Sequence, residues 1–107
     1  MEELIASAKA HHITITHIEP SRTLEFYVRP PGKPESLLAF KDAADAYFSS
    51  PRARKLQNAS VRLEKGLFDD AECLRVRCAQ NKPALDAGRA LVNSFDSRGI
   101  SVIRQKG

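Results

Sequence analysis

The alternation of apolar and polar residues from Ala59 to Ala79 (ASVRLEKGLFDDAECLRVRCA) predicts a long β-hairpin. One face of this hairpin is largely apolar and the other is charged, which is typical of a sheet packed by helices on one side. A reversal at the two central aspartates would place Arg62 opposite Arg77. Like charges directly across a ladder repel each other, so this pair favours contact with an anionic group.

The rest of the chain shows both strand and helix periodicities. Alternating or β-branched runs predict further strands at residues 13–18, 24–29 and 100–105. Apolar residues at helical spacing, with start and stop signals, predict helices at residues 2–11, 36–49 and 81–98. Ser50 followed by Pro51 is a fresh start signal, so residues 51–57 are expected to form a short helix or to prolong the preceding one after a kink.

From Leu24 onward the predicted order is strand, helix, strand, strand, helix, strand, which is the split βαβ or ferredoxin-like order. A helix and a strand precede it. Residues 13–18 should pair with residues 24–29 as a hairpin, but the first ferredoxin-like strand already has two neighbours. The extra strand therefore lies elsewhere at an edge or alters the sheet order. We predict a single α+β domain over residues 1–107, with an antiparallel sheet of four to five strands and helices packed on one face.

The basic charge is concentrated in one half of the chain. The 107 residues carry a formal charge of +4, yet residues 1–50 hold five basic and seven acidic side chains, and residues 51–107 hold twelve and six. Such asymmetry is typical of proteins that contact nucleic acid or another polyanion. A solvated basic surface is the alternative explanation.

Targeting and redox signals point to the cytoplasm. The first residues lack the basic start and long apolar stretch of a signal peptide, and the longest run without a polar residue is Leu37–Phe40. Cys73 and Cys78 lie on one predicted strand, roughly 16 Å apart and on opposite faces, so they cannot bond to each other. We expect reduced thiols, with Cys78 in the core and Cys73 nearer the other surface.

No constellation of residues predicts catalysis, a metal or a cofactor. His11, His12 and His17 lack a partner at a zinc-binding spacing. Cys73 has an arginine two residues further on, but a nucleophile also needs a base, so a structural thiol is favoured over a nucleophilic one. Gly32–Lys33 precedes a proline and lacks the second glycine of a phosphate loop. We therefore predict a non-enzymatic binding protein.

The predicted site is the basic face of the sheet, contacting an anionic partner, most simply nucleic acid. Its candidate residues on the strands are Tyr27, Arg29, Arg62, Arg75, Arg77 and Arg104. Those at its edge are Arg52, Arg54 and Lys55. RNA-recognition domains also use an open sheet face, but the chain resembles them only in architecture, because residues 73–79 contain no aromatic side chain for base stacking.

The alternative is a protein-interaction, regulatory or inhibitor module that docks an acidic protein surface, with a homodimer as a further option. Salt dependence separates the two hypotheses. Nucleic-acid binding weakens steeply with salt through counterion release, whereas a specific protein partner depends more on shape.

Overall fold

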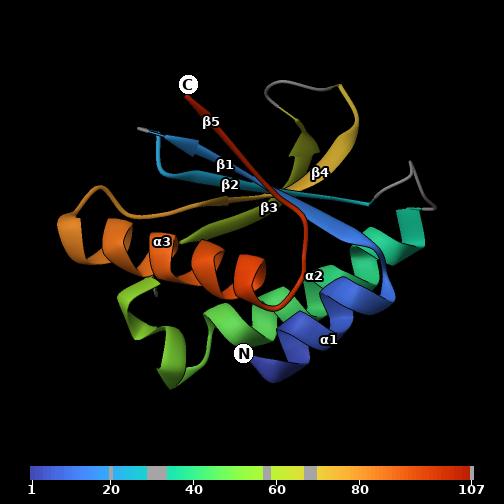
Figure 1. The fold of residues 1–107 in the computed structure, drawn as a ribbon, viewed down its shortest axis with the longest axis horizontal. Helices are drawn as coiled ribbons and strands as arrows, with labels where there is room; N and C mark the ends of the chain where they lie inside the picture. The colour runs from blue at the N-terminus through green and yellow to red at the C-terminus, as the bar shows by residue number, and fades with distance from the viewer. Residues whose placement is uncertain (20, 29–33, 57–58, 67–69, 107) are drawn as a thin grey trace.

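The computed structural model describes residues 1–19, 21–28, 34–56, 59–66 and 70–106. It is an α+β fold in which three helices and a short 3-10 helix pack against a five-stranded sheet (Figure 1). The helices are α1 (Glu2–Ala10), α2 (Pro34–Phe48), η1 (Pro51–Leu56) and α3 (Lys82–Ser97). The strands are β1 (Ile13–Glu19), β2 (Thr23–Val28), β3 (Ser60–Lys65), β4 (Glu72–Arg77) and β5 (Val102–Lys106).

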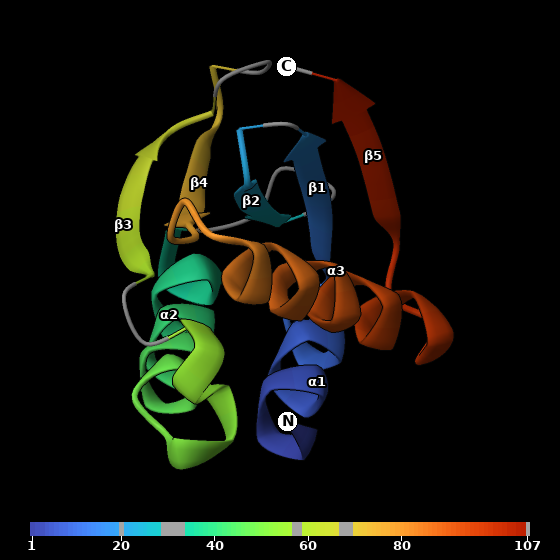
Figure 2. The ribbon, with the colours of Figure 1, turned by 90° about the vertical axis from the view of Figure 1, so that its left-hand side faces the viewer.

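The strand order is β3-β4-β2-β1-β5, so the predicted ferredoxin-like order is not what the chain adopts. Strand β1 forms the expected hairpin with β2 and also pairs with β5, which places it between the two strands that a ferredoxin-like sheet would join. The β1–β5 pair is parallel, so the sheet is mixed rather than antiparallel. Figure 2 shows β1 and β2 between the β3–β4 pair and β5.

The predicted register of the β3–β4 hairpin is wrong by two residues. Arg62 lies opposite Arg75 and not opposite Arg77. The amide of Gly66 donates to the carbonyl of Ala71, so the reversal is centred earlier than the two aspartates. Because side chains alternate with period two, a shift of two residues keeps every side chain on its predicted face.

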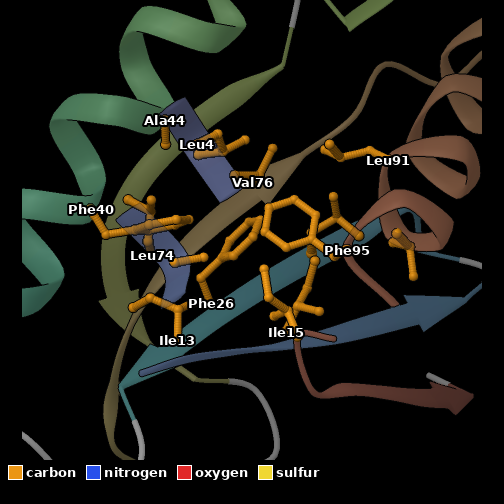
Figure 3. Close-up of a cluster of buried hydrophobic side chains, with 14 of the residues drawn as sticks. Leu4, Ile13, Ile15, Phe26, Phe40, Ala44, Leu74, Val76, Leu91 and Phe95 are labelled. Atoms are coloured by element: carbon orange, nitrogen blue, oxygen red, sulfur yellow. The ribbon is translucent and has the colours of Figure 1, made fainter. Parts of the chain in front are cut away.

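The main core lies between the sheet and the helices, as predicted. Phe26 of β2 packs against Phe40 of α2 and Phe95 of α3, with ring centroids 5.1 and 5.8 Å apart. All three rings are fully buried, which contributes roughly 2–3 kcal/mol for each. Figure 3 shows the aliphatic side chains that surround them, among them Leu4, Ile13, Ile15, Leu74, Val76 and Leu91.

The ends of α3 follow from local sequence. The Asn81 side chain accepts a hydrogen bond of 2.9 Å from the amide of Ala84, which caps the helix start as predicted. Gly99 has φ of +84°, the left-handed conformation that stops the helix before β5. The cap at Asn81 therefore determines where α3 begins after β4, and Gly99 determines where it ends before β5.

Candidate functional site

The sheet face opposite the helices carries a polar row that crosses four strands. The pairings place Arg62 of β3 opposite Arg75 of β4, Arg75 opposite Glu25 of β2, and Glu25 opposite Thr16 of β1. No helix of the described chain covers this face (Figure 1). Even so, Thr16 and Glu25 are buried. The middle of the row is therefore part of the interior, while Arg62 at its β3 end is exposed.

The centre of this row is an ion pair between Glu25 and Arg75. Glu25 is fully buried, and Oε2 of its carboxylate accepts hydrogen bonds from Nε and Nη2 of Arg75 at 2.9 and 2.7 Å. Nη1 of Arg75 donates to Oε2 of Glu64 at 2.6 Å, and Nη2 also donates to the carbonyl of Lys65 at 2.8 Å. Two carboxylates and one carbonyl thus accept hydrogen bonds from the Arg75 guanidinium. The positive charge that the sequence predicted would contact an external anion is therefore neutralised within the protein.

Tyr27 completes the network instead of forming an exposed aromatic surface. Its hydroxyl donates to Oε1 of Glu25 at 2.7 Å, and the residue is only 5% exposed. Burial, followed by the hydrogen bond to Glu25, holds the pKa of the Tyr27 phenol above its usual value. Tyr27 is therefore a fixed hydrogen-bond donor, and bases cannot stack on it while this network is intact.

Cys73 lies on the predicted face but is fully buried, so the expectation that it would lie near the surface is wrong. Burial raises the pKa of its thiol to about 12, with the Glu25 carboxylate adding to the effect. Burial also raises the pKa of the Cys78 thiol, and Cys78 belongs to the core as predicted. A thiol that stays protonated is a poor nucleophile, so neither cysteine is prepared for covalent chemistry.

The other predicted arginines of the sheet separate into different locations. Arg62 and Arg77 are exposed, although Nη2 of Arg77 lies 3.7 Å from Oε2 of Glu64. Arg104 does not share their face, because its Nη2 donates to Oδ1 of Asn93 on α3 at 3.0 Å. Arg29 lies outside the described residues. The predicted site on the sheet is thus reduced to two exposed arginines.

Arg54 and Lys55 lie on η1, where they line a groove between η1, the end of α2 and the start of α3. This groove has a volume of about 850 Å³ and follows one side of α3 from Lys82 to Ser94. All three cations are exposed, and none of them forms an ion pair with another described residue. The side chain of Arg52, the third predicted residue of this segment, lies outside the described part of the structure.

The floor of the groove is apolar. Ala53, Leu56 and Leu91 are buried at its base, while Tyr47 and Ala87 are half-buried along its walls. Small alanine side chains on η1 and α3 leave the space between the two elements open. The arrangement combines an apolar base with a basic rim, and it lies on the helical layer rather than on the sheet.

The histidines do not form a site with other ligands. His17 is buried and its Nε2 lies 3.7 Å from Oε1 of Glu19, whereas His12 is exposed at the end of α1. Burial lowers the pKa of His17, so its ring is neutral at pH 7. Among the residues that the structure describes, no group of three or more His, Cys, Asp or Glu side chains could hold a metal ion.

The sequence alone did not indicate the roles of Glu25 and Lys82, the two residues that alter the predicted site most. Glu25 is not among the predicted site residues, because its role depends on a strand partner fifty residues away. Lys82 was treated as part of a helix start, although it faces the groove beside Arg54 and Lys55. No local pattern indicates the place of Lys82, because the groove forms only where η1 packs against α3.

Comparisons of the chain with protein-family models, with curated proteins and with solved structures found no match. None of the described helices is long and apolar enough to cross a membrane.

Proposed function

We propose that this chain is a non-enzymatic binding protein that contacts an anionic macromolecule through the basic rim of the groove, formed by Arg54, Lys55 and Lys82. The observation that carries the proposal is that these three exposed cations gather around one concave surface without carboxylate partners among the described residues. Elsewhere on the surface, Arg89 and Arg98 are each held by a glutamate. Cations that the fold leaves unpaired are available to a partner.

Two exposed arginines, Arg62 and Arg77, lie outside the groove, on the sheet face opposite the helices. Arg77 ends β4 and a short connection leads from it to Lys82, while Ser60, opposite Arg77, follows η1 closely in the chain. Arg62 lies one pair further along β3 on the same face as Arg77. The three cations that share the groove, Arg54, Lys55 and Lys82, support electrostatic attraction of a polyanion to this surface.

The chemistry of the buried network supports a binding role over an enzymatic one. The Glu25, Tyr27 and Arg75 side chains are bonded to one another, and the Cys73 thiol is protonated because its pKa is raised. An acid, base or nucleophile needs access to substrate and a pKa suited to proton transfer. These groups stabilise the sheet instead.

The experiment is fluorescence anisotropy with labelled single-stranded DNA, duplex DNA, RNA and polyglutamate at about 50 and 200 mM salt. The test variant is Lys55→Gln/Lys82→Gln. Its matched control is Lys9→Gln/Lys106→Gln, which removes the same charge from exposed positions outside the groove. We expect the test variant to bind about tenfold more weakly and with a smaller salt slope, by about one for each lysine removed, and the control to be unchanged.

Equal weakening in both variants would mean that the groove has no special role. The absence of binding to every one of these anions at the lower salt would eliminate the proposal. Light scattering on the same samples would establish whether binding requires a homodimer.

A further inference from the structure

We infer that the partner segment held in this groove is an amphipathic acidic helix of another protein. The inference rests on the proposed function, because it uses the same basic rim, and it adds the floor of the groove to the argument. The groove is walled by η1 and α3 and floored by Leu56 and Leu91, with Lys55 and Lys82 on its rim. Each part constrains the partner differently.

The apolar floor selects against nucleic acid. A phosphate backbone placed over the exposed Pro51, Pro83 and Ala90 would lose water without gaining hydrogen bonds from these side chains. Stacking of bases requires exposed aromatic rings. Among the described residues that line the groove, Tyr47 alone is aromatic, and its ring already packs edge-on against Phe48, with ring centroids 5.3 Å apart. Apolar side chains of a partner gain free energy by covering Pro51, Pro83 and Ala90, which line the groove and are exposed, whereas Ala53, Leu56 and Leu91 beneath them are already buried.

The helical walls select against an extended peptide. An extended segment gains affinity by pairing its backbone with the open edge of a sheet. Here the walls are α3 and η1, whose backbone groups are bonded mainly within their own turns. A strand laid in the groove would leave its amides and carbonyls unsatisfied, whereas a helix satisfies its own. Helix-in-groove docking is the mode that fits.

The charges fix the polar flank of the partner. Arg54, Lys55 and Lys82 lie on the rim, and the acidic side chain among the described lining residues is that of Asp86. A partner helix with leucines toward the floor and carboxylates along its flank would meet both surfaces. A second hollow of about 390 Å³ shares Met1 and Tyr47 with the groove and leads toward Glu2 and Glu3 of α1. The acidic flank should therefore lie over η1 and α3, away from α1.

The probe is a labelled peptide of about 18 residues, with leucines at helical spacing and glutamates elsewhere. A scrambled peptide of the same composition keeps the charge but loses the apolar face. The groove-filling variant is Ala90→Trp, since Ala90 is exposed on α3 and lines the groove. Its control is Ala39→Trp, at an exposed position of α2 that does not line it. Circular dichroism establishes that each variant folds.

We expect the amphipathic peptide to bind at least about tenfold more tightly than the scrambled one, and to lose binding in Ala90→Trp and in Lys55→Gln/Lys82→Gln but not in the controls. Equal binding of both peptides would overturn the inference. So would binding of RNA or polyglutamate through Lys55 and Lys82 without preference for the helix, although the proposed function would then stand. Failure of every anion to bind would overturn both.

Discussion

Arg75 and Glu25 lie directly opposite each other on β4 and β2, and two nitrogens of the guanidinium donate to the same carboxylate oxygen. The Arg75 side chain is 10% exposed and that of Glu25 is completely covered. Such a pair stabilises the fold only while both members are present, because either charge alone would be buried without its partner. The arginine that the sequence placed in a binding site is thus a structural residue.

Replacing Arg75 should therefore be costly. Arg75→Met would leave the Glu25 carboxylate buried without its guanidinium, and we expect a loss of about 3–5 kcal/mol in the free energy of unfolding. Urea denaturation at pH 7 measures it. The comparison is Arg89→Met, which removes an exposed arginine paired with Glu19 and should barely shift the midpoint. Equal stability of the Arg75 variant and the parent protein would contradict this account.

The stability of the protein should fall on mild acidification through His17. Burial lowers its pKa below 6.5 in the folded state, with Arg104 and Arg89 adding to the effect and Glu19 opposing it. The unfolded chain takes up a proton near pH 6.5 while the folded protein does not, so stability is constant above that value and decreases below it. Urea midpoints between pH 5 and 8 should show this slope in the parent, and a flatter profile in His17→Gln.

Neither thiol should react in the native protein. Cys73 and Cys78 are buried and their pKa values are raised, so an aromatic disulfide reagent at pH 8 should label them only after unfolding. The reaction followed by absorbance, with and without urea, measures the number of accessible thiols. Rapid labelling of one thiol without urea would show that its strand opens readily or that the thiol is activated.

Replacing Gly99 and Gly88 with alanine should change the stability of the protein in different directions. Gly99→Ala places a side chain on a residue whose φ is +84°. An added Cβ would contact no other atom within 4 Å, so the cost comes from the backbone conformation alone, and we expect the protein to be destabilised by about 1 kcal/mol. Gly88→Ala adds a methyl group 3.4 Å from Sγ of Cys78, an ordinary contact, within α3. Its better helix propensity should leave stability unchanged or up to about 1 kcal/mol higher. Thermal denaturation of both variants tests the contrast.

Much of the fold could be predicted because its signals are local. Side-chain periodicity located the helices and strands, and the cap at Asn81 and the turn at Gly99 marked the limits of α3. The two faces of the hairpin were also predicted, since the register error of two residues preserves the face of Arg62 and Arg75. The error itself arose because Asp69 and Asp70 are strong turn formers, while the hydrogen-bonded reversal already begins at Gly66.

The rest depends on contacts between distant segments. Nothing near Glu25 in the sequence indicates that β4 will pair with β2 and place Arg75 over it. Nothing local places β1 between β2 and β5 either, although the conflict over the neighbours of β2 could be identified from the sequence. The groove likewise forms only where η1 and α3 meet, so the basic residues of η1 were predicted as the edge of a sheet site from which the fold separates them.

Four of the five strands form two local hairpins, β1–β2 and β3–β4, that meet along a single line between β2 and β4, and β5 adds to the outer side of β1. Each hairpin closes a short loop, but joining the two hairpins closes one of about fifty residues, which carries a larger entropy cost than either hairpin alone. The Glu25–Arg75 pair sits on that line. A substitution that lowers stability does so by slowing folding, by speeding unfolding, or by both. We expect this partition to differ between substitutions within either hairpin and substitutions at the Glu25–Arg75 pair. Folding and unfolding rates measured against denaturant concentration would therefore show when the two hairpins join.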